Sequence, residues 1–162
     1  LMAPRFFFLL SLCVLPAALV SATRPVRTPF VVQGRVFCDT CKAGFETPAT
    51  TYIQGAKVRL ECKNRDTQQV VFSCDSVTDH TGTFEINVAY DHGDEICEAL
   101  VVSSPQKGCQ SVLPGREKSR VILTNYNGIS SNVRFANSMG FVQKEAASGC
   151  AQIMKLYEEE DV

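Results

Sequence analysis

Two cysteines three positions apart, Cys38 and Cys41, have a spacing known from thiol–disulfide chemistry. A redox-active Cys-x-x-Cys pair needs a thiolate with a lowered pKa, usually at a helix N-terminus within a βαβ unit. Here the pair ends the alternating stretch Phe30–Phe37, which is typical of a strand, and Asp39 lies between the two cysteines. We therefore expect two covalent bridges from the end of a strand to other parts of the chain, and no redox catalysis.

The two histidines, His80 and His92, do not lie in a pattern typical of a metal site. Zinc would require a second Cys or His pair at similar spacing, and the acidic bend at 91–95 lacks the alternating oxygen ligands of a calcium loop. Both histidines stand beside aspartates in expected turns, which indicates solvated loop residues. A Ser–His–Asp set with members far apart in sequence stays open, but no Gly-x-Ser-x-Gly motif and no glycine-rich phosphate loop occur. The sequence predicts a protein without catalytic residues, bound metal or cofactor.

The first 22 residues have the layout of a secretory signal peptide. Arg5 precedes an apolar run over residues 6–20, and the small residues at 20–22 offer a cleavage site. A membrane anchor is the alternative, but Pro16 and the small residues after the run argue against it. We expect residues 1–22 to be removed, residues 23–29 to form an extended lead-in, and the product to be secreted into the extracellular space.

Charge and length exclude several classes of partner. The formal net charge is −1, with no basic stripe of the kind that binds nucleic acid. No apolar run after the leader approaches the roughly 20 residues that span a bilayer, so no membrane contact is expected after cleavage. About 140 residues remain, which suits one domain over residues 30–162.

An oxidising compartment makes the cysteines candidates for bridges. Cys13 leaves with the leader, and seven cysteines remain, at positions 38, 41, 62, 74, 97, 109 and 150. Three disulfides and one unpaired cysteine are the simplest arrangement. Six bridged cysteines allow fifteen connectivities, and spacing alone does not choose among them.

Short alternating stretches separated by turn signals dominate the rest of the chain. Besides the first stretch they are Ala56–Cys62, Val70–Cys74, Phe84–Val88, Cys97–Ser103, Arg120–Thr124 and a last one around Val133 and Phe135. This pattern predicts a mainly β fold, an antiparallel β-sandwich or barrel of about seven strands. Residues 141–159 change to helical spacing, which predicts a short C-terminal helix. The phenylalanines Phe30, Phe37, Phe72, Phe84, Phe135 and Phe141 mostly fall on inward positions and are expected in the core.

Five segments in order carry a resemblance to a known family: VQGRVFCDTCKAGFET, IQGAKVRLECK, EICEALVVSS, KGCQ and MGFVQKEAASGCAQ. Together they resemble the Ole e 1-like family of plant pollen proteins, which includes the major olive allergen and pollen- and anther-specific relatives. The resemblance runs from about Val32 to Tyr157 and implies the pairs Cys38–Cys109, Cys41–Cys150 and Cys62–Cys97. Cys74 has no counterpart in that pattern. Since Cys74 falls on the inward side of its strand, we expect a buried free thiol rather than an intermolecular bridge.

The resemblance implies a secreted protein that is not an enzyme and that acts in pollen hydration or pollen-tube growth. Its partner would be an unknown extracellular protein or cell-wall component, and antibodies would recognise it if it is allergenic. The alternative is an extracellular module that binds cell-wall polysaccharide or a receptor, which an exposed aromatic or apolar patch would favour. A third class, an inhibitor-like scaffold, would present the loop Pro105–Glu117 as a rigid exposed segment.

Overall fold

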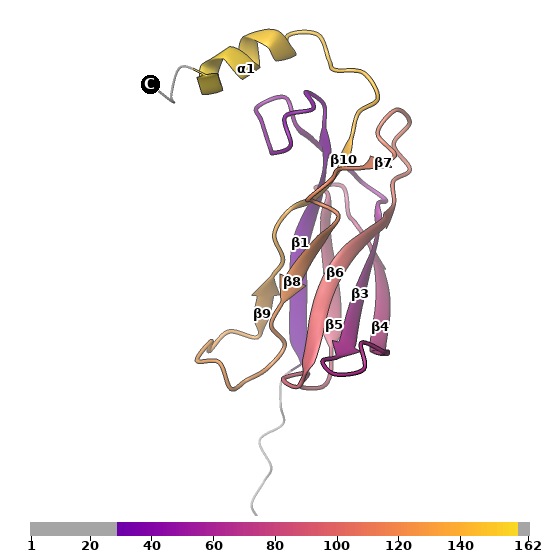
Figure 1. Cartoon of the computed structure of the whole chain (residues 1–162), viewed down its shortest axis with the longest axis vertical. Helices are drawn as coiled ribbons and strands as arrows, with labels where there is room; N and C mark the ends of the chain where they lie inside the picture. Colours follow the sequence, from indigo (N-terminus) through magenta and orange to yellow (C-terminus); the bar gives the residue numbers. More distant parts are fainter. Residues whose placement is uncertain (1–28, 159–162) are drawn as a thin grey trace, which may run out of the picture.

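The computed structural model describes residues 29–158 and shows two β-sheets that enclose one core (Figure 1). The expected signal peptide and most of the expected lead-in lie outside the described residues. The described elements, in chain order, are β1 (Phe30–Asp39), β2 (Thr51–Tyr52), β3 (Lys57–Asn64), β4 (Val70–Val77), β5 (Thr83–Val88), β6 (Glu95–Ser103), β7 (Ser111–Val112), β8 (Lys118–Val121), β9 (Val133–Phe135), β10 (Met139–Val142) and α1 (Cys150–Glu158). The predicted mainly β sandwich with a short C-terminal helix and three disulfides is confirmed.

One sheet is antiparallel throughout, in the order β4-β3-β6-β8. The other is organised around β1, whose first part pairs with β5 and β9 and whose last part pairs with β2 and β10. β9 and β10 run parallel to β1, which the antiparallel expectation did not include. Residue alternation indicates which face of a strand is buried but not the direction of the neighbouring strand. The sequence pattern therefore could not predict the parallel pairs.

Two glycines let aromatic rings lie directly against the backbone of this sheet. A Cβ atom at Gly34 would lie 2.7 Å from Cζ of Phe84, and one at Gly140 would lie 2.9 Å from Cζ of Phe37. Both rings are fully buried. Gly34 and Gly140 therefore stand where any side chain would displace a core phenylalanine.

The prediction that Phe135 lies in the core is wrong. Phe30, Phe37, Phe84 and Phe141 are buried and Phe72 is half-buried, as expected, but Phe135 is 75% exposed. On the three-residue strand β9 the inward position belongs to Arg134, which is 4% exposed. Its guanidinium donates to the backbone carbonyls of Ile122, Thr124 and Ser131, and lies 4.9 Å from the ring centre of Phe30. Because those carbonyls satisfy the buried cation, the neighbouring apolar side chain points outward.

Cys74 is free and half-buried rather than fully buried, and it packs against the core. The reason is its position on β4, an edge strand on which Val70 is 50% exposed. The two sheets therefore cover the thiol only from one side.

The C-terminal helix is shorter than predicted. Residues Met139–Val142 pair with β1, so α1 begins only at Cys150 and ends at Glu158. The expected apolar side of the helix is confirmed, since Ile153, Met154 and Tyr157 are half-buried. α1 lies beyond one end of the sandwich (Figure 1). The ring centre of Tyr157 lies 5.0 Å from that of Phe45. Over the described residues, no helix has the length and apolar character needed to span a membrane.

Candidate functional site

Of the two cysteines of the Cys-x-x-Cys motif, Cys38 lies on β1 and Cys41 lies two residues beyond its end, and they bond to different segments. Cys38 is joined to Cys109, with Cα atoms 6.1 Å apart, and Cys41 to the first residue of α1, Cys150, at 5.3 Å. A third disulfide, Cys62–Cys97, links facing residues of β3 and β6. The end of β1 is thus tied to the loop before β7 and to α1, which places the loops of one end of the sandwich relative to one another.

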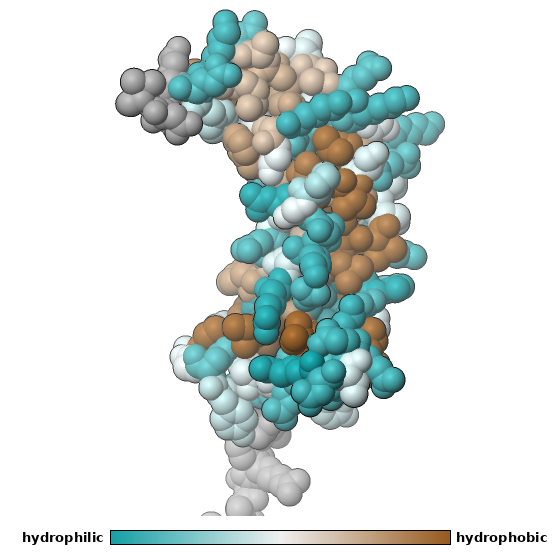
Figure 2. Space-filling view, viewed as in Figure 1, coloured by the Kyte–Doolittle hydropathy of each residue, from teal (hydrophilic) through white to brown (hydrophobic). Residues whose placement is uncertain are grey.

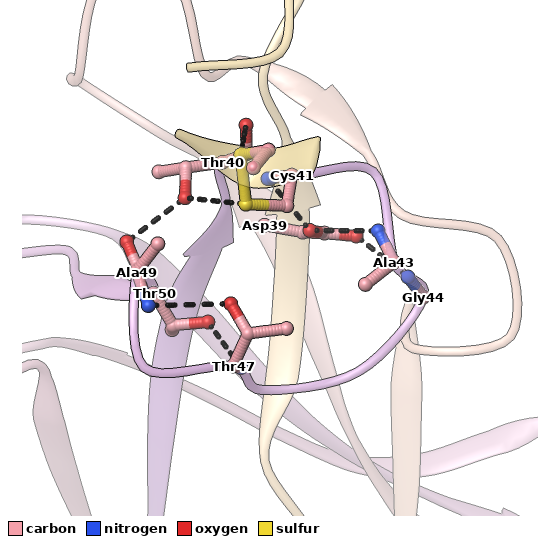
Figure 3. The surroundings of a disulfide bond; sticks show 9 residues. Asp39, Thr40, Cys41, Ala43, Gly44, Thr47, Ala49 and Thr50 are labelled. Atoms are coloured by element: carbon pink, nitrogen blue, oxygen red, sulfur yellow. Dashed lines mark hydrogen bonds between the residues drawn. A yellow bond between two sulfur atoms is a disulfide. The ribbon is translucent and has the colours of Figure 1, made fainter. Parts of the chain in front are cut away.

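Between the two bridged cysteines, Asp39 is completely buried and organises the following loop (Figure 3). Its carboxylate accepts hydrogen bonds from the backbone N–H groups of Cys41 at 3.2 Å, Ala43 at 3.0 Å and Gly44 at 2.7 Å. The Thr40 hydroxyl donates to the carbonyl of Ala49 at 2.8 Å. The sequence shows Asp39 only as a residue between two cysteines, whereas in the structure its carboxylate holds the backbone of residues 40–44.

His92 differs from the expectation of a solvated loop histidine, while His80 is exposed as predicted. The His92 side chain is only 9% exposed, its Nδ1 lies 3.3 Å from a carboxylate oxygen of Glu95, and its ring packs 5.0 Å from that of Phe72. Ligand atoms of His92, Cys62 and Cys97 lie within 4.8 Å of one another. Both sulfurs belong to the disulfide, and a metal ligand must be a thiolate, so this cluster does not form a metal site in the bridged protein.

The outward side of β5, β1 and β9 forms the candidate binding surface, which we call the Phe135 face. It is defined by Gln33, Arg35, Thr83, Glu85, Phe135 and Ser138. A hollow of about 270 Å³ lies beside Phe135 and is lined by the polar side chains of Gln33, Arg35, Thr83 and Ser138. A second hollow of about 440 Å³ shares Gln33 and Thr83 and extends over the turn between β4 and β5.

The polar groups of the Phe135 face are held by their neighbours. The guanidinium of Arg35 lies 3.5 Å above the ring of Tyr52, and the amide of Gln33 donates to Glu85 at 3.2 Å. Tyr52 in turn donates to Glu46 at 2.8 Å, and this hydrogen bond, with burial, raises the pKa of its phenol. An exposed ring beside ordered donors and acceptors can stack on an apolar ligand face and hydrogen-bond to the ligand's edge. Alternation alone could not find this site, because it assigned Phe135 to the core.

A second exposed surface is aliphatic. Figure 2 shows hydrophobic side chains on the surface over β6 and β7, where Val102 is 40% and Val112 is 41% exposed. An exposed aliphatic surface is more typical of protein contacts than of sugar contacts.

At the edge of the Phe135 face, Asp79 holds the turn between β4 and β5. The hydroxyl of Thr81 and the backbone N–H groups of Thr83 and Thr81 donate to its carboxylate, and these bonds lower the pKa of Asp79. Because the pKa is lower in the folded chain, the stabilisation is complete above the unfolded value of about 3.9 and is lost as the pH falls through the folded value.

We expect Thr81→Val to raise the titration midpoint of Asp79 toward its ordinary value, because it removes the hydroxyl donor. The midpoint is measured by NMR on the carboxyl carbon. Thr67→Val, which changes a hydroxyl in another turn, is the control and should leave the midpoint unchanged. An equal midpoint in wild type and Thr81→Val would contradict the role given to the hydroxyl.

These features define the class of protein: a β-sandwich stapled by three disulfides, two of which start from neighbouring positions at the end of its central strand. The chain belongs to the family described as pollen protein Ole e 1 like, whose model matches residues 28–158. This family has no known catalytic activity.

The chain is similar to several curated proteins and to a solved structure. It is 42% identical to "Pollen-specific protein C13" of Zea mays over 94% of this chain and 89% of that protein. It is 39% identical to "Anther-specific protein LAT52" of Solanum lycopersicum over 94% of both. The crystal structure of the major plantain pollen allergen Pla l 1 superposes with a TM-score of 0.67 at 30% identity, covering 75% of this chain and 99% of that one. Allergens are recognised by antibodies, so relatives of this chain are antibody targets.

Proposed function

We propose that this chain is a secreted, non-catalytic pollen protein that acts in pollen hydration or pollen-tube growth by binding an extracellular partner. Family membership, the leader-like first 22 residues and the three disulfides, which suit an oxidising compartment, support the proposal. Pollen lacking the protein should hydrate or extend tubes more slowly than wild-type pollen.

The exposed ring of Phe135 is the observation from which we infer the class of partner. Burying Phe135 in the core would have been favourable, yet it stands 75% exposed beside a hollow lined by an amide, a guanidinium and two hydroxyls. This combination favours the reading of a module that binds cell-wall polysaccharide, since a sugar presents an apolar ring face and a polar rim. The aliphatic surface over β6 and β7 favours a receptor or another protein as the second candidate.

The test compares Phe135→Ala with Tyr90→Ala, since both side chains are 75% exposed and Tyr90 does not line the described hollows. Binding is measured on an array of neutral wall polysaccharides that includes xyloglucan, galactan and cellulose. We expect Phe135→Ala to weaken binding to the recognised glycan by about tenfold, the loss of roughly 1.4 kcal/mol of stacking.

Neither substitution should change the free energy of unfolding by more than about 0.5 kcal/mol, because both side chains are on the surface. Equal glycan binding by wild type and Phe135→Ala, or equal loss in both variants, would overturn the assignment of this face. Binding to no glycan, together with capture of a receptor ectodomain through the surface over β6 and β7, would support the second candidate instead.

A further inference from the structure

A groove on the disulfide-rich end of the molecule is separate from the Phe135 face. Its volume is about 460 Å³, and it lies between the loop after β1, the segment of β7 and the segment that follows β10. Leu113 and Pro114 give it an apolar wall, Ser111 and Gln143 add a hydroxyl and an amide, and Lys42 and Lys144 are its two charged residues.

The two ammonium groups are not neutralised by acids that line the groove, because no Asp or Glu is among its lining residues. Asp39, next to the loop, is buried, and its carboxylate is committed to three backbone N–H groups. Of the acids that neighbour these loops in sequence, Glu46 accepts from Tyr52, whereas Glu117 and Glu145 are exposed and do not line the groove. The lysine ion pairs of the described residues are made by Lys63 and Lys118, elsewhere on the molecule.

The backbone holds both lysines at the groove. Lys42 has φ 56°, a left-handed conformation that a residue with a side chain rarely adopts, and the hydrogen bonds to Asp39 on either side of it maintain this conformation. The N–H of Lys144 donates to the carbonyl of Gly108 at 3.0 Å, next to the bridged Cys109. Strained residues held in place by their surroundings concentrate at functional sites, so the conformation of Lys42 supports a binding role.

From this arrangement we infer that the groove binds an acidic saccharide of the uronate class. Its carboxylates would pair with Lys42 and Lys144, and the C–H face of a sugar ring would lie against Leu113 and Pro114. The choice of a saccharide rests on the proposed function at the cell wall, whereas the preference for an anion rests on the groove alone. The groove would thus give the protein a preference for acidic over neutral saccharides, in addition to the glycan contact assigned to the Phe135 face.

The test measures binding of an oligogalacturonide by calorimetry and compares it with the methyl-esterified form of the same chain length. Wild type should bind the acid form at least tenfold more tightly, and raising the salt from 20 to about 200 mM should weaken that binding several-fold, because exposed charges are screened. Lys42→Gln combined with Lys144→Gln should reduce binding of the acid form to the level of the ester. Lys57→Gln combined with Lys63→Gln changes the net charge equally on β3, which does not line the groove, and should keep at least half of the affinity.

Lys42→Gly separates ligand binding from structure. Glycine accepts the left-handed conformation without strain, so this variant should unfold at the same or a higher urea concentration while binding the acid form several-fold more weakly. Full binding by Lys42→Gly and by the double lysine variant would overturn the inference. Binding of inorganic phosphate or sulfate with the same lysine dependence, but not of the oligogalacturonide, would overturn the uronate assignment.

The experiments can refute the proposed binding role of the groove and that of the Phe135 face independently. Loss of neutral glycan binding in Phe135→Ala with intact oligogalacturonide binding would leave the groove standing. Intact Phe135-dependent binding with no acid preference would refute the groove and leave the proposed function untouched.

Discussion

Replacing Cys38 and Cys109 together by alanine is expected to lower the free energy of unfolding by about 4 kcal/mol. The bridge spans 71 residues of sequence, so without it a long loop regains conformational freedom in the unfolded state of the variant. Both cysteines are buried, and Cys38 lies on β1, the strand that four others pair with, so the variant also loses packed sulfur atoms in the core. The loss should appear in urea unfolding as a lower midpoint with a somewhat steeper slope, because the unfolded chain without this cross-link exposes more surface.

The matched control is Cys74→Ala, which removes a half-buried free thiol on an edge strand. We expect it to cost no more than about 1 kcal/mol. Non-reducing peptide mapping of the wild-type protein belongs to the same experiment, and should find the linked pairs 38–109, 41–150 and 62–97 with Cys74 open to alkylation. A bridge between Cys38 and Cys41 would contradict this disulfide pattern and would favour redox chemistry at the Cys-x-x-Cys motif.

Arg134→Met is expected to cost about 3 kcal/mol of unfolding free energy. Methionine fills similar space, but the carbonyls of Ile122, Thr124 and Ser131 lose their donor in a part-buried position. The contact of the cation with the ring of Phe30 is lost as well. The backbone amide hydrogens between β8 and β9 should then exchange with solvent faster than they do in the wild type, while the amides of β3 and β6 change less.

Arg120→Met is the control for Arg134→Met, since Arg120 is exposed on β8 and its replacement should change stability by no more than about 0.5 kcal/mol. Arg134→Lys keeps the charge but reaches fewer carbonyls, so we expect an intermediate loss. If Arg134→Met were as stable as Arg120→Met, the carbonyl contacts would not be the reason that Phe135 points outward.

Local patterns in the sequence were sufficient for much of the fold. The alternation in Ala56–Cys62 predicted β3, with Val58, Leu60 and Cys62 buried, because a strand buried on one face repeats every two residues. The family segments around the cysteines predicted the Ole e 1-like class, which the family match confirms. The spacing of Ile153, Met154 and Tyr157 predicted α1, although residues 141–149 were wrongly included.

The binding surfaces were decided by the tertiary structure. Arg134 takes the inward position of β9 only because the chain brings the carbonyls of residues 122–131 around it, and this contact turns Phe135 toward solvent. The groove likewise joins Lys42 and Lys144, about a hundred residues apart in sequence, through the parallel pairing of β1 and β10 and the bridge to Cys109. Periodicity reports the environment of neighbouring residues, whereas strand direction and the partners of a buried charge depend on segments far along the chain.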